Sequence, residues 1–198
     1  MMRESYSKNY FEKYAALTLA RFLHIKESDI FHDDRPDLRL YTLNLGIEVT
    51  QALTPEEAVA DIKKPLYASI DMTPFDHNHK DKSFVFEKLD NAIERKIEKS
   101  RNYDVYKENG LYIFSHCHNL KEDELYHYFI NLPYTYLFFR YIYINAITRL
   151  YCFDFIDKKM SYIHFSKSEL ITMNVDSLRY EKTCSKERRQ IILEKLFK

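Results

Sequence analysis

An acidic residue, Glu48, stands inside the short β-branched run Ile-Glu-Val-Thr at residues 47–50, and this placement constrains the fold more than any other feature of the chain. A carboxylate in such a run is costly to bury unless another group pairs with it. Residues 37–41 alternate between apolar and polar side chains, as a half-buried strand does. A hairpin that turns at residues 42–45 would set Asp37 opposite Glu48. Two facing carboxylates repel each other, and a hard divalent cation relieves that repulsion.

The surroundings of the two acids leave a second interpretation open. Pro36 suits the first position of a strand, where no ladder donor is needed. Gly46, one of only two glycines, indicates a tight reversal or a close backbone approach. The alternative to a metal pair is that Asp37 caps a turn while Glu48 lies on a solvated strand face.

Composition narrows the class of protein. The 198 residues suffice for one domain with a core, and we expect a single domain over 1–198. Lysine plus arginine equals aspartate plus glutamate at 30 each, so nucleic-acid binding would need a local basic patch. Three distant cysteines indicate a reducing compartment. The polar N-terminus does not fit a signal peptide. Polar residues interrupt the apolar stretch 129–150, so this stretch does not fit a membrane span. We therefore expect a cytoplasmic protein with no membrane contact.

Helical and extended patterns alternate along the chain. We expect helices at 8–23, 83–103, 121–132 and 185–197, a hairpin at 37–52, and strands at 111–116, 141–147, 150–155 and 160–165. Thr54, followed by proline and two glutamates, is typical of a helix start. This order predicts an α/β fold with a mixed central β-sheet flanked by helices.

The predicted helix at 83–103 supplies a second candidate group. Its apolar residues centre on one side, Lys96 falls near the middle of that arc, and Lys99 lies toward its edge. A lysine on an apolar helix face usually snorkels to solvent or pairs with a carboxylate. Snorkelling is one interpretation. The other is that the Lys96 ammonium reaches the cleft that holds Asp37 and Glu48.

These residues resemble the core motif of the PD-(D/E)XK, or restriction-endonuclease-like, nuclease superfamily. The chain has a Pro-Asp pair ending at Asp37, then ten intervening residues, then Glu-Val-Thr starting at Glu48. The expected order of elements is similar to the α-β-β-β-α-β order of that core. The resemblance covers residues 8–118 and leaves 119–198 as additional strands and a C-terminal helix. Thr50 departs from the motif, which has lysine at this position.

The resemblance implies a restriction-endonuclease-like core and metal-assisted hydrolysis of phosphodiester bonds. The implied metal is Mg²⁺ or Mn²⁺, and its implied ligands are the Asp37 and Glu48 side chains and the backbone carbonyl of Val49. Glu12, near the start of the first helix, is similar to an acidic residue that often completes such sites. Loss of either metal carboxylate should then abolish cleavage.

The missing lysine has an implied replacement. Some superfamily members carry a displaced lysine on the following helix, so Lys96, and after it Lys99, would act in place of the lysine that Thr50 replaces. Lys96 would position the attacking water or offset negative charge in the transition state. Its loss should slow cleavage by several orders of magnitude at most.

The implied partner is nucleic acid, in the first place DNA, in a mobile-element or phage-defence setting, with a homodimer as one arrangement. The alternative function is a catalytically inactive nuclease-like domain that binds nucleic acid or protein. Thr50 favours the inactive domain, whereas Lys96 on the inner helix face favours the enzyme.

Overall fold

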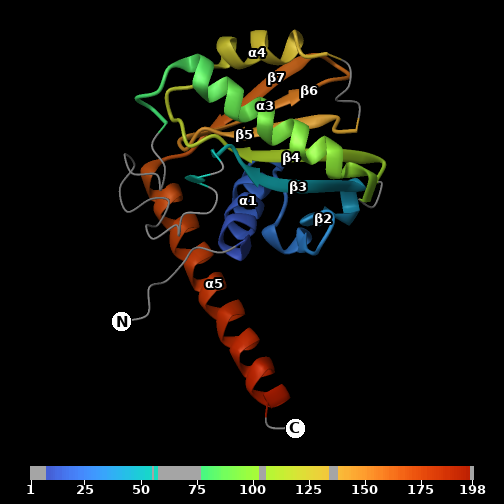
Figure 1. Cartoon of the computed structure of the whole chain (residues 1–198), viewed down its shortest axis with the longest axis vertical. Coiled ribbons are helices and arrows are strands. Elements are labelled where there is room, and N and C mark those ends of the chain that lie inside the picture. The colour runs from blue at the N-terminus through green and yellow to red at the C-terminus, as the bar shows by residue number, and fades with distance from the viewer. Residues whose placement is uncertain (1–7, 55, 58–76, 103–105, 134–137, 197–198) are drawn as a thin grey trace.

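The computed structural model describes residues 8–54, 56–57, 77–102, 106–133 and 138–196, with the backbone alone for residue 101 and residues 188–196. At its centre is one mixed sheet of seven strands in the spatial order β1-β2-β3-β4-β5-β6-β7. Helices cover both faces of the sheet, so the chain has the α/β fold that its alternating patterns predict (Figure 1).

The elements follow one another as shown in Figure 1. The strands are β1 (Phe31–His32), β2 (Leu38–Leu40), β3 (Leu45–Gln51), β4 (Glu108–Phe114), β5 (Tyr141–Asn145), β6 (Arg149–Asp154) and β7 (Lys159–His164). The α-helices are α1 (Lys8–Leu23), α3 (Lys82–Lys99), α4 (Glu122–Ile130) and α5 (Lys167–Leu196). Three short 3₁₀-helices are η1 (Glu27–Asp29), η2 (Tyr41–Leu43) and η3 (Ser100–Asn102).

A parallel centre joins two antiparallel flanks of the sheet. β1, β2 and β3 pair antiparallel, β3, β4 and β5 pair parallel, and β5, β6 and β7 pair antiparallel. Parallel neighbours require crossover connections, and α3 and α4 lie in the two connections of the parallel centre. Both of these helices pack on one face of the sheet, whereas α1 and α5 pack on the other.

The two faces carry separate cores. Alternate residues of β4 point to opposite layers: Tyr112 and Phe114 pack in the core of α1, while Leu111 and Ile113 pack in the core of α3. All four are buried because helices cover both faces. This explains why β4 has the continuous apolar sequence that predicts a buried strand.

The hairpin of β2 and β3 has the predicted register. Leu38 pairs with Ile47, which sets Asp37 opposite Glu48 at the next position. The turn is η2, closed by Asn44 in the left-handed conformation with φ of 47°. The turn that sets the pairing of β2 with β3 thus lies at the predicted place. β2 is shorter than the alternating stretch 37–41 indicates.

Gly46 marks a close approach and not a reversal. A Cβ atom at this position would lie 2.7 Å from Cγ of Pro36 and 2.8 Å from Cδ2 of Tyr106. Only glycine leaves room for the proline ring that directly precedes Asp37. Gly46 therefore helps to place the strand end that carries this carboxylate.

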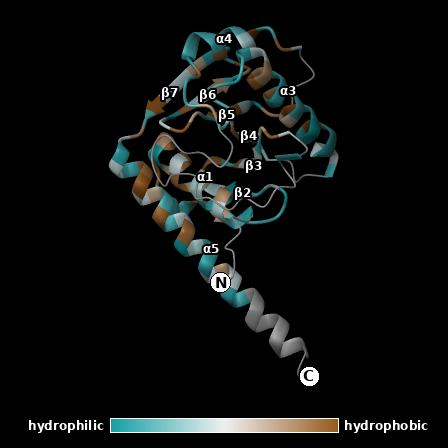
Figure 2. Ribbon diagram, turned by 60° about the vertical axis from the view of Figure 1, so that its left-hand side comes forward, coloured by the Kyte–Doolittle hydropathy of each residue, from teal (hydrophilic) through white to brown (hydrophobic). Residues whose placement is uncertain are grey.

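Most predicted helices begin and end within a few residues of their expected bounds, but α5 does not. It starts at Lys167, whereas the sequence predicted a helix at 185–197 only. Its buried residues include Leu170, Met173, Asn174, Ser177 and Glu181. Three of these five are polar, and hydrophobic and hydrophilic residues alternate along the helix (Figure 2). The apolar stripe is too weak to predict the first half of α5.

The helix start predicted at Thr54 is supported by two reciprocal hydrogen bonds. The Glu57 amide donates to Oγ1 of Thr54 over 3.2 Å, and the Thr54 amide donates to Oε2 of Glu57 over 2.8 Å. Together they form a capping box. The proline between them lies outside the described residues.

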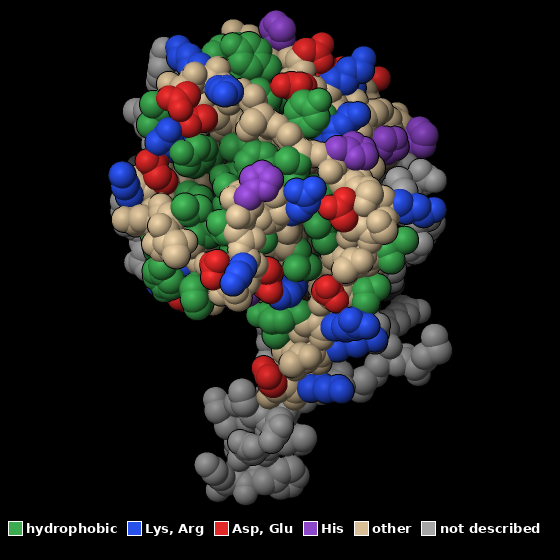
Figure 3. Space-filling model, turned by 180° about the vertical axis from the view of Figure 1, so that it is seen from behind, with side chains coloured by type: hydrophobic (Ala, Val, Ile, Leu, Met, Phe, Trp, Pro, Cys, Tyr) green, Lys and Arg blue, Asp and Glu red, His purple; other side chains and the backbone are tan. Residues whose placement is uncertain are grey.

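The surface mixes apolar and charged side chains. Hydrophobic groups gather between acidic and basic ones on the face turned away from the viewer of Figure 1 (Figure 3). No helix within the described part of the chain is both long enough and apolar enough to cross a membrane.

Candidate functional site

Three buried carboxylates lie where the hairpin meets α1 and α3. Asp37 directly precedes β2, Glu48 lies in the middle of β3, and Glu12 lies in the second turn of α1. Their exposed fractions are 4%, 4% and 6%. Carboxylates this buried must be offset by cations or hydrogen-bond donors, and two lysines contribute to this.

Lys96, in the last turn of α3, contacts both strand carboxylates. Its Nζ lies 2.5 Å from Oε2 of Glu48 and 3.7 Å from Oδ2 of Asp37. The side chain is only 15% exposed. Of the two interpretations of this lysine, pairing therefore describes the structure, and snorkelling does not.

Lys8, at the start of α1, contacts the cluster from the opposite helix layer. Its Nζ lies 2.7 Å from Oδ1 of Asp37, 3.2 Å from Oε1 of Glu12 and 3.5 Å from Oδ1 of the exposed Asp34. Partial burial disfavours the charged form, but the hydrogen bond to Asp37 and the charges of Asp37 and Glu12 outweigh it, so the pKa of Lys8 is raised. Asp37 thus lies between two ammonium groups.

Sequence reasoning missed Lys8, although a signal was present. Lys8 precedes Glu12 by four residues, a spacing that places both on one helix face. The helix pattern alone does not show that this face meets the hairpin.

Glu12 connects the cluster to the C-terminal helix. Its Oε2 lies 4.0 Å from Nδ1 of His32, and the imidazole of His32 stacks on Tyr180 of α5 with ring centroids 5.0 Å apart. The carboxylate that the resemblance implied as an additional ligand is thus packed between α1, β1 and α5.

The main chain of β3 orients Asp37. The amide of Val49 donates a hydrogen bond to Oδ2 of Asp37 over 2.8 Å. One oxygen of this carboxylate is therefore held by the neighbouring strand, while the other faces Lys8. This fixes the side chain without requiring that a metal ion be bound.

Thr50, at the position where the motif has lysine, lies beneath an arginine of α3. Nη2 of Arg95 donates to Oγ1 of Thr50 over 3.0 Å and to the carbonyl of Gln51 over 3.3 Å. Arg95 precedes Lys96 in sequence but was not predicted, because it falls on the polar side of the helix. Lys99 is exposed, and within the described residues it makes no ion pair with either strand carboxylate.

A second polar group lies at the carboxyl ends of β3 and β4. Nε2 of His116 lies 3.2 Å from Oε1 of Gln51, and Nε2 of His77 lies 3.0 Å from Oε1 of Glu57. The two imidazole rings are 5.8 Å apart and both are buried. Burial, together with the nearby charge of His77, lowers the pKa of His116 to about 3, so this ring is neutral at physiological pH.

The donor atoms of the cluster suit a hard divalent cation in part. Mg²⁺ and Mn²⁺ bind carboxylate and carbonyl oxygens, and Asp37 and Glu48 both contact the same ammonium of Lys96. A cation near that point would contact both acids. However, across the described ranges no three His, Cys, Asp or Glu side chains converge on a metal position. The residues fit a site of two carboxylates completed by main-chain or water oxygens, with Glu12 outside it.

Comparisons with known proteins add no relative. No family model matches the chain, no curated protein matches it, and no solved structure matches it.

Proposed function

We propose that this chain is a nuclease that depends on Mg²⁺ or Mn²⁺ and hydrolyses phosphodiester bonds in DNA. The observation that carries the proposal is the pair of buried carboxylates, Asp37 and Glu48, on adjacent strands and in contact with the same lysine of α3. Burial of three acids around two lysines costs stability. A functional site is a reason to retain such a costly arrangement, and this donor chemistry suits a metal bound to phosphate.

The arrangement of elements supports the proposal. The order α1, β1, β2, β3, α3, β4, with β3 and β4 parallel across the α3 connection, agrees with the α-β-β-β-α-β order of restriction-endonuclease-like cores. Asp37 directly precedes β2 and Glu48 lies within β3, in line with the resemblance. In this proposal α4, β5 to β7 and α5 are additions to such a core.

Each residue of the cluster has a proposed task. A divalent cation, when bound, supplies a Lewis acid for a phosphoryl oxygen and lowers the pKa of a coordinated water. Asp37 and Glu48 would hold it, and the Val49 amide would keep Asp37 oriented. Lys96 would orient the attacking water or offset charge that develops on the phosphate. Arg95, exposed above Thr50, would contact a phosphate oxygen.

A second candidate function is a nuclease-like domain without catalysis that binds nucleic acid or protein. Thr50 favours it, because its hydroxyl binds Arg95 and cannot supply the charge of a lysine. In this alternative Lys96 and Lys8 are permanent partners of the buried acids and no metal displaces them.

A cleavage assay with isosteric variants tests the proposal. Wild-type protein should cleave supercoiled plasmid and linear duplex in Mg²⁺ or Mn²⁺, and chelation should stop it. Asp37→Asn and Glu48→Gln should each abolish cleavage, because both remove a metal carboxylate while retaining side-chain size. Asp34→Asn is the matched control, since Asp34 is 75% exposed and contacts the cluster only through Lys8. Cleavage that survives both variants, or that never occurs, contradicts the proposal.

Measurement of DNA binding separates the two candidate functions. A mobility-shift titration of wild-type protein and Asp37→Asn would detect binding without cleavage. DNA binding in the absence of any cleavage, with or without metal, would favour the inactive module over the enzyme.

A further inference from the structure

A cavity of about 370 Å³ opens far from the carboxylate cluster. It is lined by Phe22 and Leu23 at the end of α1, whereas Lys8 and Glu12 lie at the start of that helix. The two places are separated by about 20 Å along the helix axis. The cavity volume lies in the range of small-molecule sites, about 300–1,000 Å³. The cavity is therefore a candidate site separate from the proposed nuclease centre.

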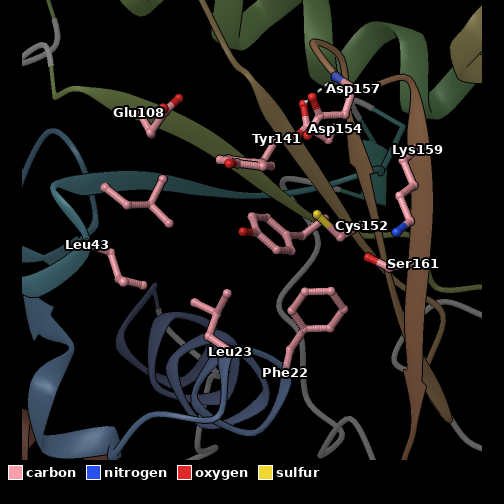
Figure 4. Close-up of a pocket in the computed structure, with 12 residues that line it drawn as sticks. Phe22, Leu23, Leu43, Glu108, Tyr141, Cys152, Asp154, Asp157, Lys159 and Ser161 are labelled. Atoms are coloured by element: carbon pink, nitrogen blue, oxygen red, sulfur yellow. Dashed lines mark hydrogen bonds between the residues drawn. The ribbon is translucent and has the colours of Figure 1, made fainter.

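The body of the cavity is apolar and aromatic. Phe22 and Leu23 line it together with Tyr143 of β5, and Leu43 of η2 lies on the same side as Leu23 (Figure 4). The rings of Phe22 and Tyr143 meet edge to face with centroids 5.7 Å apart, and Tyr141 lies 6.2 Å from Tyr143. Such walls favour a flat apolar ligand over a strongly hydrated one.

The rim of the cavity carries an excess of carboxylates. Glu108, Asp154 and Asp157 line it and converge on one guanidinium, that of Arg140. The distances from Arg140 nitrogens to these acids are 2.8, 2.9 and 3.5 Å. Arg140 and Lys159, which also lines the cavity, offset two of these three negative charges, so the rim keeps an excess of one negative charge that attracts a cation.

The rim is also rigid, because Arg140 and main-chain donors hold Asp154. Two guanidinium nitrogens of Arg140 donate to this carboxylate, and so do the amides of Ile156 and Asp157. Burial acts against its ionised form, but these hydrogen bonds outweigh burial and keep the pKa of Asp154 below its usual range. Lys159, the cation among the residues that line the cavity, extends along β7 toward Ser161 (Figure 4).

The thiol in the cavity belongs to Cys152 and is protonated at physiological pH. Cys152 lies beside Tyr143 and is buried, which raises the pKa of the thiol to about 12. A thiol is unreactive while it stays protonated. We therefore assign Cys152 no covalent role toward a ligand in this cavity.

We propose that this cavity binds a small hydrophobic amine, with its apolar body against the wall of Phe22, Leu23 and Tyr143 and its ammonium at the carboxylate rim of Glu108, Asp154 and Asp157. The ligand class follows from the combination of an aromatic wall and an acidic rim. This site goes beyond the proposed nuclease function and does not depend on it.

Calorimetric titration of the full chain without DNA tests the inference. The probe is tryptamine, and indole-3-acetate provides the same ring with the opposite charge. Tryptamine should bind at least about tenfold more tightly, since the rim attracts one charge and repels the other. Tryptamine that binds no better than indole-3-acetate, or that does not bind at about 1 mM, overturns the inference.

Variants locate the binding. Glu108→Gln combined with Asp157→Asn should weaken tryptamine binding about tenfold and leave indole-3-acetate binding unchanged or improved. Ser161→Phe, on the exposed edge strand β7, should block the cavity and abolish binding. Asp176→Asn removes an acid of α5 outside the lining and should change nothing. Full tryptamine affinity in Ser161→Phe, with the fold confirmed by circular dichroism, contradicts the proposal.

Discussion

Lys96 makes the burial of two acids on neighbouring strands tolerable. Asp37 and Glu48 face each other in register, and without a cation between them their charges would repel in a poorly solvated site. The Lys96 ammonium contacts both, while Lys8 contacts Asp37 from the other side. In the absence of metal, the stability of this region should depend on these lysines.

Substitution of Lys96→Met should reveal this dependence. Removal of one partner from a buried ion pair costs about 3 kcal/mol, so urea unfolding in chelator should show a loss of that size. Millimolar Ca²⁺ should restore part of it by replacing the missing charge. Lys99→Met is the control, because Lys99 is exposed and its loss should change stability by less than about 0.5 kcal/mol. Equal stability of both variants would show that the ammonium does not offset the acids.

His116 is a second residue whose charge state is set by the fold. It is buried beside His77 and has a positive φ of 55°, a conformation that is uncommon outside glycine but that asparagine, aspartate and histidine adopt more often than other residues. With a folded pKa of about 3 and an unfolded pKa of about 6.5, the ring gains a proton on unfolding between these values. The unfolded chain then binds more protons, so stability falls as the pH is lowered below about 6.5.

This predicts a pH effect that one substitution removes. Between pH 6.5 and 5.0 the contribution of His116 to the loss of stability should reach about 2 kcal/mol at most. His116→Asn tolerates the positive φ and does not titrate. The difference in urea unfolding free energy between pH 7.5 and 5.0 should be smaller in the variant by about this amount. Identical pH profiles for the two proteins would refute the assignment.

The sequence identified residues of the cluster that follow a local pattern, and missed those that depend on docking. Asp37 and Glu48 could be paired because strand alternation and the turn define the register, and Lys96 because helix periodicity defines a face. Arg95 contacts Thr50 from the polar side of the same helix, and Lys8 approaches from a helix in another layer. Both contacts depend on how α3 and α1 dock on the sheet, and a short stretch of sequence does not show this docking.

At the scale of elements, the β2–β3 hairpin depends on one glycine. Gly46 faces the ring of Pro36 and the ring of Tyr106, and both would clash with an added methyl group. The proline precedes Asp37 directly, so any displacement of its ring also moves the carboxylate. Packing of the hairpin and geometry of the site are therefore coupled at this position.

Gly46→Ala should therefore destabilise the fold, although alanine usually suits a strand better than glycine. We expect a cost of about 1–3 kcal/mol, typical of an overpacked core, measured by urea unfolding. Gly110→Ala is the graded comparison, because its added Cβ would meet Ile47 and Tyr143 at 3.2 and 3.3 Å, a tighter fit that small shifts relieve. Its cost should be less than about 1 kcal/mol. The reverse order of the two variants would contradict this account.

Helices and strands were predictable from the sequence where their apolar residues follow one clear pattern. α1 and β4 have a clear apolar stripe and a continuous apolar run, and both were expected near their observed bounds. The first half of α5 packs partly through polar groups, such as Asn174, which accepts a hydrogen bond from the buried Tyr10. A helix held by such contacts has no strong amphipathic pattern. β1, with only two residues, is too short for any periodicity to show.

At the scale of the whole molecule, one sheet connects the region of the resemblance to the remainder. β4 and β5 pair along their lengths, so the strands that follow residue 118 extend the same sheet. The chain is neutral overall, with 30 basic and 30 acidic residues. Long-range attraction of a polyanion is therefore weak. A cation bound at the cluster would change the local charge, and the near-zero net charge of the chain would not oppose this change.

This leads to a prediction for the folding equilibrium of the intact protein. A ligand that binds only the folded state stabilises it by RT ln(1 + [L]/Kd), about 1.4 kcal/mol at tenfold excess over Kd. Ca²⁺, which takes oxygen ligands, should raise the thermal unfolding midpoint of the wild type in a concentration-dependent way. Asp37→Asn and Glu48→Gln should lose this shift because each removes a carboxylate ligand, whereas Asp34→Asn should retain it. A midpoint that Ca²⁺, Mg²⁺ and Mn²⁺ all leave unchanged would mean that Lys96 and Lys8 are not displaced, and the inactive binding module would then be the better description of the chain.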